Sequence, residues 1–441
     1  MEAALHFPRT GLLEDLPTYL KHTMVPSYIF SYPKGTESGT YFAIDIGGST
    51  LKLGVTRFSS NGPRKLLYAT SLPLDDSVKN LDGQSFFRWV ASQLQSVQLK
   101  AESYRWIEEG SVVCLGVTWS FPLQQTSASS AKILRMGKGF SSLCDDIIGW
   151  DLADSLISAC ADLQVPIKVI AIVNDSVATI LSHLHTDPEC QVGAIVGTGV
   201  NAAIRLPTNT LYEERFSEFS SADLEKCEYC VINSELSFFG GDGILPKTKW
   251  DVDLEASIDG PSQPFELMTS GLYMAELARS IIEDKLLNFR PLTAYPSDLR
   301  HPYGLEASTM GMIEGELDLE FARQMFLAKH PCKQGRLSFT LEDMKFMKST
   351  FYAISSRAAA IVAAGLMAIA ITTVPQTSKP SGSDVVVGVT GSVFLNYPRF
   401  YARVQEFLNL LGRRRGRKVR LAPLTDAGIW GASVAAVCND F

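Results

Sequence analysis

Two segments of the chain repeat one local design, in which an apolar strand, a glycine turn and a second apolar strand follow one another. The first is Tyr41 to Val55 (YFAIDIGGSTLKLGV), and the second is Val192 to Ile204 (VGAIVGTGVNAAI). Alternating apolar residues on both sides of a tight glycine turn are typical of β-hairpins. Two such units in one chain predict a duplicated fold.

Predicted strands and helices alternate around these two hairpins. They are a helix at Ser85 to Ala101, strands at Val112 to Thr118 and Ile167 to Val173, helices at Glu266 to Leu287 and Leu341 to Thr373, and a strand at Val385 to Val389. Such alternation predicts an α/β fold whose sheets are covered by helices. The 441 residues exceed the size at which one hydrophobic core stops growing, so two large lobes are expected.

Two further stretches are predicted to be exposed loops. Pro375 to Ser383 is rich in proline, serine and glycine, and Arg413 to Arg420 holds six basic residues in eight. A nuclear-targeting role is the second interpretation of the basic stretch.

Charge and hydropathy limit the partners that we expect. A formal net charge of −7 disfavours bulk attraction to nucleic acid or to an anionic membrane surface. The charge-free run from Ala358 to Val374 is shorter than the roughly 20 strongly apolar residues of a membrane span, so we predict a buried helix that ends before Pro375.

The cysteines and the first residues of the chain indicate the compartment. Eight scattered cysteines suit reduced thiols, and the opening residues carry no secretory pattern, so a cytoplasmic protein is predicted. Cys227 and Cys230 form one C-x-x-C without a second pair or a nearby histidine, and no metal is assigned to them.

The first glycine turn has the groups of an anion site. Gly47-Gly48-Ser49-Thr50 offers backbone N–H groups and two hydroxyls in one turn. Asp45 precedes it on the strand and is a candidate to position the hydrated Mg²⁺ that accompanies ATP, while Lys52 adds a positive charge. A plain hairpin turn with a surface lysine is the alternative.

A second anion site is predicted at Gly197-Thr198-Gly199. This turn lacks the third glycine and the following helix of a dinucleotide-binding fingerprint, which excludes that class. Two such turns in two half-folds suit the binding of one polyphosphate from both sides.

Asn174 and Asp175 stand directly after a fully apolar strand. In open α/β sheets, ligands bind at the carboxyl ends of the strands, so Asp175 is a candidate general base. The alternative is that the pair only caps a helix beginning at Ser176.

The chain resembles the hexokinase family, because several motifs occur in the family's order over nearly the whole length. These motifs are IDIGGST, LGVTWSFPLQQTSASSAKILRMGKGF, VNDSVAT, VGTGVN, VINSE, QPFELMTSGLYMAELAR and VGVTGSVF. The resemblance implies a two-lobed actin-like ATPase fold, related to ribonuclease H, with duplicated sheets around a central cleft that closes on the sugar. It places the small lobe at residues 38–173 with a C-terminal helix at 427–441, and the large lobe at 174–426 with an N-terminal arm at 1–37.

The resemblance also implies the roles of individual residues. Asp175 is the base, and Gly391 and Ser392 bind adenosine. The sugar-binding residues are Ser120, Lys138, Asn174, Asn201, Glu235 and Glu266. The implied reaction transfers the γ-phosphoryl group of ATP to the 6-hydroxyl of a hexose, with Mg²⁺ carried by ATP rather than by a protein cage. The protein is expected to be a monomer or a homodimer.

Departures from the family pattern bear on the substrate. Gly137 and Leu236 stand where the family usually has threonine and tryptophan, which predicts a wider sugar pocket. Fungal N-acetylglucosamine kinases of the family share the Gly-Gly-Ser-Thr type of first loop, so N-acetylglucosamine is the leading substrate hypothesis and glucose, mannose or fructose the next. Thr390, Ile429 and Trp430 also depart, on the nucleotide side, and leave a third hypothesis, a sugar sensor with weak or no turnover.

Overall fold

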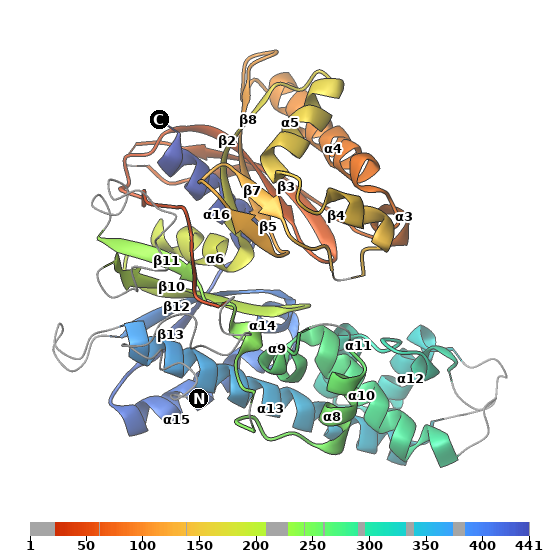
Figure 1. Ribbon diagram of the computed structural model, residues 1–441. Coiled ribbons are helices and arrows are strands. Elements are labelled where there is room, and N and C mark those ends of the chain that lie inside the picture. The colour runs from red at the N-terminus through yellow and green to blue at the C-terminus, as the bar shows by residue number, and fades with distance from the viewer. Residues whose placement is uncertain are drawn as a thin grey trace. The chain divides into compact units, whose positions relative to one another are not determined.

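The computed structural model describes residues 23–60, 62–137, 139–208, 228–241, 243–258, 261–289, 296–331, 339–373 and 384–440. The fold is mixed α/β, and the chain divides into two compact units (Figure 1). Unit 1 is built from Ile195–Asn201 and Glu235–Pro423, and unit 2 from Met24–Ala194, Ala202–Ser234 and the segment that begins at Leu424. The lobe boundaries at residues 38, 173 and 426 stay a prediction.

Unit 2 contains a five-stranded sheet in the order β4-β3-β2-β5-β8. Its strands are β2 (Gly39–Ile46), β3 (Thr50–Phe58), β4 (Lys65–Pro73), β5 (Val113–Trp119) and β8 (Ile167–Asn174). β2 and β3 form the predicted antiparallel hairpin, whereas β2, β5 and β8 run parallel. The carboxyl ends of these three strands therefore meet at one edge of the sheet.

Each described α-helix of unit 2 buries apolar side chains, and the four longer ones contact strands of this sheet. These helices are α3 (Asp76–Lys79), α4 (Gly83–Ser103), α5 (Leu152–Asp162), α6 (Asp175–Leu184) and α16 (Ala427–Asn439). Asp82 caps α4, and the apolar residues of α4 recur every three or four positions, including Phe86, Val90 and Leu94. α16 packs on α6, β2, β5 and β8. A short ribbon of β6 (Leu123–Gln125) and β7 (Ala131–Ile133) completes this part.

A second sheet has six strands in the order β1-β11-β10-β9-β12-β13. They are β1 (Val25–Pro26), β9 (Cys190–Val196), β10 (Val200–Pro207), β11 (Tyr229–Asn233), β12 (Val385–Thr390) and β13 (Val419–Pro423). β9 and β10 are the two strands predicted around the second glycine turn. β12 is buried along its whole length, as its valine-rich sequence predicts for a strand covered on both faces.

Most of the helices of unit 1 follow Gly240. They are α8 (Lys249–Ala256), α9 (Pro264–Thr269), α10 (Gly271–Lys285), α11 (Ala307–Gly315), α12 (Leu319–Lys329), α13 (Leu341–Thr373), α14 (Ser392–Asn396) and α15 (Phe400–Arg415). The helical stretch predicted at Glu266 to Leu287 is confirmed, and it is divided into two helices because Ser270 has extended backbone and separates α9 from α10. The break directs the Gly271 N–H to the carbonyl oxygen of Gly197, at 2.7 Å.

The long helix α13 is the one described helix that is long and apolar enough to cross a membrane, and 72% of its apolar window is buried inside the fold. It packs on α9, α10, α11, α12 and α15. The predicted buried helix is therefore confirmed, and the loop predicted at Pro375 to Ser383 lies outside the described residues.

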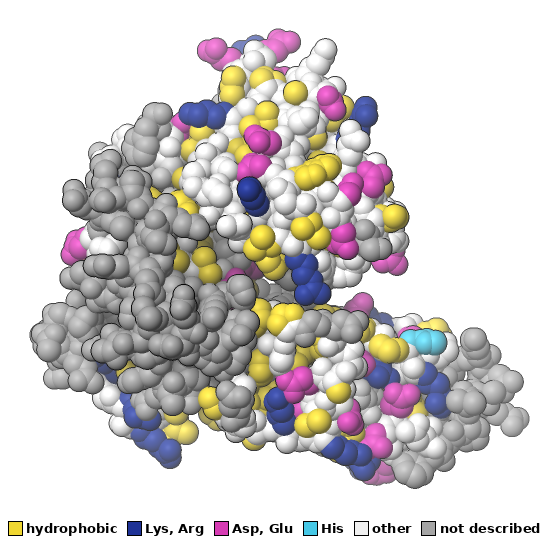
Figure 2. Space-filling model, viewed as in Figure 1, with side chains coloured by type: hydrophobic (Ala, Val, Ile, Leu, Met, Phe, Trp, Pro, Cys, Tyr) yellow, Lys and Arg dark blue, Asp and Glu magenta, His cyan; other side chains and the backbone are white. Residues whose placement is uncertain are grey.

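The exposure predicted for Arg413 to Arg420 is largely confirmed, but the loop is shorter than predicted because both ends of the stretch belong to regular elements. Arg413, Arg414 and Arg415 form the last turn of α15, Gly416 ends that helix in the left-handed conformation at φ 63°, and β13 begins at Val419. Basic side chains suit the last turn because the helix dipole is negative there. On the face drawn in Figure 2, basic and acidic side chains are interspersed.

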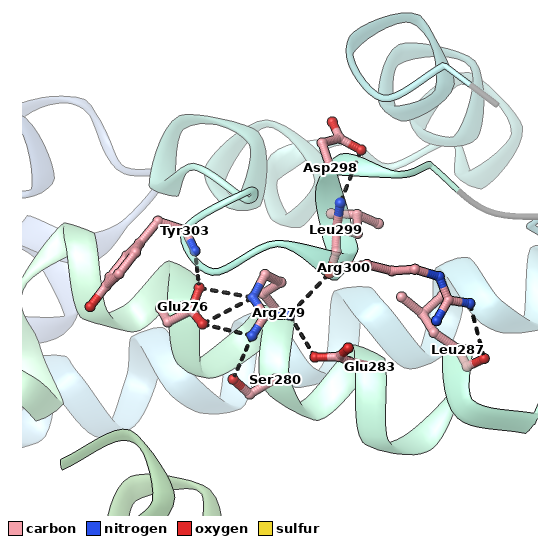
Figure 3. A network of polar contacts seen from close by, with 9 residues as sticks. All are labelled: Glu276, Arg279, Ser280, Glu283, Leu287, Asp298, Leu299, Arg300 and Tyr303. Atoms are coloured by element: carbon pink, nitrogen blue, oxygen red, sulfur yellow. Dashed lines mark hydrogen bonds and ion pairs between the residues drawn. The ribbon is translucent and has the colours of Figure 1, made fainter. Parts of the chain in front are cut away.

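A buried ion network holds the segment around Leu299 and Tyr303 against helix α10 (Figure 3). Arg279 on α10 donates to both carboxylate oxygens of Glu276, to Glu283 at 2.7 Å and to the carbonyl oxygen of Leu299 at 3.0 Å. Glu276 also accepts from the N–H of Tyr303 at 2.5 Å. The buried charges of Arg279 and Glu276 are therefore paired with each other and hydrogen-bonded, as buried charges require.

Candidate active site

Three predicted site residues lie at one edge of the unit 2 sheet. Asp45 is the last but one residue of β2, Ser120 follows β5, and Asn174 ends β8. In the parallel register, Ile46 pairs with Trp119, and Trp119 pairs with Asn174. The Ser120 N–H donates to the carbonyl oxygen of Ile46 at 3.0 Å, which holds the ends of β2 and β5 together.

The first glycine turn connects β2 to β3 at this same edge. The Gly47 N–H donates to the carbonyl oxygen of Thr50 at 3.0 Å and closes the turn, and Ser49 is its exposed residue. The Lys52 ammonium pairs with the Asp426 carboxylate at 3.2 Å, and both side chains are about one-third exposed, at 34% and 37%. A phosphate role for Lys52 stays a prediction, and the structure adds a protein partner for its charge.

Asp45 lies against the first turn of α16, a contact that the sequence did not predict. A Cβ built at Gly428 would lie 2.2 Å from Oδ2 of Asp45, so a glycine is required at that position. The buried Thr118 hydroxyl donates to the carbonyl oxygen of Gly428 at 3.0 Å. The resemblance predicted a C-terminal helix at 427–441, and α16 lies there, but its contact with Asp45 had no signal in the sequence.

Asn174 and Asp175 begin helix α6, and the capping geometry is present. Oδ1 of Asn174 accepts from the Ser176 N–H at 2.9 Å and from the Ser176 hydroxyl at 2.7 Å. Asp175 is the first residue of the helix and is half-buried. Asn174 therefore caps the helix, and the Asp175 carboxylate next to it stays at the strand end. The capping role of the pair is compatible with the predicted role of Asp175 as a general base.

In unit 1, the second glycine turn is held by two other segments. The Gly197 N–H donates to the carbonyl oxygen of Gly199 at 2.9 Å, which closes the turn after β9. A Cβ at Gly197 would lie 3.4 Å from the backbone nitrogen of Ser392, and a Cβ at Gly391 would lie 2.4 Å from the carbonyl oxygen of Val196. The predicted phosphate turn and the predicted adenosine residues therefore adjoin each other.

Two of the predicted sugar residues in unit 1 bond to the backbone around this turn. Oε2 of Glu266 accepts from the Val200 N–H at 2.9 Å, and Oδ1 of Asn201 accepts from the Leu236 N–H at 3.2 Å. Glu235 precedes Leu236 and has left-handed backbone, with φ 50° and ψ 51°. A non-glycine residue in this conformation is typical of sites where the fold constrains a functional side chain.

The residues that suggested a wider pocket differ in their surroundings. A Cβ built at Gly137 meets no described atom within 4 Å. Leu236 is only 2% exposed and lies near Gly365 of α13. Lys138, a predicted sugar residue, and Cys227 lie outside the described residues, while Cys230 is a buried cysteine.

Two solved hexokinase structures align with this chain over most of its length. The hexokinase from Schistosoma mansoni, complexed with glucose, aligns with a TM-score of 0.78 and 25% identity over 94% of this chain and 88% of that chain. A second hexokinase crystal structure aligns with a TM-score of 0.73 over 99% of this chain and 92% of that chain, at 22% identity. The predicted α/β fold class of the actin-like ATPases is thereby confirmed.

Sequence comparison agrees with the structural one. Two family models, both described as hexokinase, match residues 7–185 and 191–438. Hexokinase-1 of Saccharomyces cerevisiae is 27% identical over 95% of this chain and 84% of its own length. Glucokinase of Aspergillus niger is 28% identical over 95% of this chain and 89% of its own. The chain belongs to the hexokinase family.

Proposed function

We propose that this protein is an ATP-dependent hexose kinase that phosphorylates the 6-hydroxyl of its sugar. The observation that carries the proposal is the position of Asp175, at the carboxyl end of β8, on the sheet edge that also holds Asp45 and Ser120. Membership of the hexokinase family supports the reaction class.

In the proposed reaction, the Asp175 carboxylate accepts the proton of the sugar 6-hydroxyl. The hydroxyl oxygen forms a bond to the γ-phosphorus of ATP, the bond from that phosphorus to the bridging oxygen breaks, and ADP leaves. Phosphoryl transfer depends mainly on positioning and charge neutralisation. The proposed phosphate groups are the backbone N–H groups of the Gly47–Thr50 turn and the Gly197–Gly199 turn.

Magnesium is proposed to arrive with the nucleotide. One half-buried carboxylate, Asp45, fits a hydrated Mg²⁺ that keeps most of its waters, rather than a complete protein cage. When bound, the ion neutralises phosphate charge. Asp45 would hold it through water at the end of β2.

The proposed sugar contacts are amide, hydroxyl and carboxylate groups. The proposed residues are Ser120, Lys138, Asn174, Asn201, Glu235 and Glu266. Amide, hydroxyl and carboxylate side chains can bond to several sugar hydroxyls at once. A sugar that lacks one of those hydroxyls would leave a buried polar group unpaired and would therefore bind more weakly.

Glucose is the first substrate to test, because the similar proteins are named hexokinase and glucokinase and one solved relative is complexed with glucose. N-acetylglucosamine is the second candidate. The open space at Gly137 favours it, because a 2-acetamido group needs more room than a hydroxyl. Cytoplasmic localisation and a monomeric or dimeric state stay predictions.

A coupled ADP-release assay against glucose, mannose, fructose and N-acetylglucosamine tests the proposal. We expect turnover of at least one sugar, with Asp175→Ala as the negative control. If calorimetry shows that sugars bind but none is phosphorylated, the chain acts as a sugar sensor and the proposed activity is wrong.

A further inference from the structure

Arg64, the residue before β4, connects two helices of unit 2. Its Nη1 donates to the carbonyl oxygen of Ser182 at 2.9 Å, and its guanidinium carbon lies 4.2 Å from the centroid of the Trp430 ring. Burial lowers the pKa of Arg64 to about 10, so the group keeps its charge at neutral pH. One cation thus contacts the end of α6 and the first turn of α16.

The carbonyl oxygen of Ser182 belongs to the last turn of α6, where backbone carbonyls lack partners within the helix. This end of the helix is also the negative end of its dipole, which favours a guanidinium. Asp175 is the first residue of the same helix. Arg64 therefore holds one end of the helix whose other end carries the proposed base.

At two other places the backbone of α6 lies directly against a glycine. A Cβ at Gly431 of α16 would lie 2.0 Å from the carbonyl oxygen of Ala178, and a Cβ at Gly193 of β9 would lie 2.5 Å from the backbone nitrogen of Ile180. Helices pack by placing side-chain ridges into grooves. At these two contacts the backbones lie close together, and the glycines contribute no side chain that would oppose sliding along the helix axis.

We propose that Arg64, stacked on Trp430, is a positioning residue that fixes α6 along its axis and so places the Asp175 carboxylate. This inference rests on the proposed role of Asp175. The first turn of α16 also includes the residues next to Asp426, the partner of Lys52. The stack therefore ties the helix of the base to the element that contacts Asp45 and Lys52, the residues on either side of the first glycine turn.

Arg57 provides a matched control. It lies on β3 of the same sheet, and its guanidinium also donates to a backbone carbonyl, that of Trp106 at 3.0 Å, and to the Thr40 hydroxyl at 3.2 Å. Neither partner belongs to α6. A purely structural role predicts similar effects for Arg64→Met and Arg57→Met.

The test compares Arg64→Met, Arg64→Lys and Arg57→Met in the full chain. For Arg64→Met we expect kcat to fall by about tenfold, since small misplacements of a reacting group lower rates strongly. Nucleotide-free sugar affinity should change by less than about twofold, because only kcat depends on the position of the base. Arg64→Lys, which keeps the charge and one donor, should recover part of kcat.

Hydrogen exchange gives a second measurement that does not require turnover. In Arg64→Met, amides of residues 176–184 should exchange about tenfold faster, while Arg57→Met should leave them unchanged. Equal effects of the two methionine variants on kcat and on exchange would overturn the inference. If the unmodified protein has no kinase activity, the proposed function fails, and exchange in residues 176–184 alone decides whether Arg64 holds α6.

Discussion

Oε2 of Glu266 accepts a hydrogen bond from the N–H of Val200 at 2.9 Å, so a proposed sugar residue is bonded to the backbone beside a proposed phosphate turn. Gly199 lies between these two groups. A Cβ built there would be 2.7 Å from the same carboxylate oxygen. The turn and the carboxylate therefore cannot move independently.

We expect Gly199→Ala to weaken both substrates. The added methyl group must displace the Glu266 carboxylate, so the sugar Kd without nucleotide and the KM for ATP should each rise by about tenfold, or about 1.4 kcal/mol. Calorimetry and steady-state kinetics measure the two effects. Gly241→Ala, where an added Cβ would meet only Pro264 at 3.9 Å, is the control, and the same response from both variants would contradict the argument.

Asp175→Ala should lower kcat by at least about a hundredfold, the lower range for removal of a positioned general base. Sugar binding measured by titration should remain, because the backbone and Asn174 stay in place. Asp154→Ala, in the first turn of α5, is the matched control for loss of an acidic residue at a helix start. Near-normal turnover in a folded Asp175→Ala protein would show that Asp175 is not the base.

Specificity can be tested at Gly137 alone. Gly137→Thr adds bulk where no described atom lies within 4 Å, so it should fold normally. If that space admits a 2-acetamido group, kcat/KM for N-acetylglucosamine should fall relative to glucose by about 1 to 3 kcal/mol. Leu236→Trp should instead destabilise the fold by about 1 to 3 kcal/mol, because Leu236 is already buried. An unchanged ratio of the two sugars for Gly137→Thr would rule out the wider pocket.

Acid should destabilise the protein partly through His185. Burial, and next the charge of Arg64, hold the pKa of His185 below its usual value of 6.5, and Glu37 opposes the shift. The unfolded chain then binds this proton at a higher pH than the folded chain does. The contribution is complete above pH 6.5 and is lost as the pH falls from 6.5 through the lower folded pKa.

His185→Phe, which keeps an aromatic ring beside Phe58, should therefore flatten the decline in unfolding free energy between neutral and mildly acidic pH. Denaturant titrations at several pH values measure this. His301→Phe, at an exposed position, is the control. An unchanged slope in the His185 variant would contradict the assignment.

Local sequence was sufficient for much of the fold. The hairpin of β2 and β3, the strands around the second glycine turn and the long buried helix all follow from apolar periodicity and glycine turns, which depend on near neighbours. The position of Asn174 and Asp175 after an apolar strand indicated a site for the same reason. Because β2, β5 and β8 are parallel, Asn174 and Asp175 lie at the same edge of the sheet as Asp45.

Only the tertiary structure decided the contacts between distant segments. Lys52 meets Asp426, 374 residues away, and Arg64 meets Ser182 and Trp430. Ser270 interrupts a helical pattern where the Gly271 N–H bonds to Gly197. Periodicity records which face of an element is apolar, but it contains nothing about which remote backbone group takes a hydrogen bond. Those pairings follow from how the strands and helices pack, and they fix the groups of the candidate site.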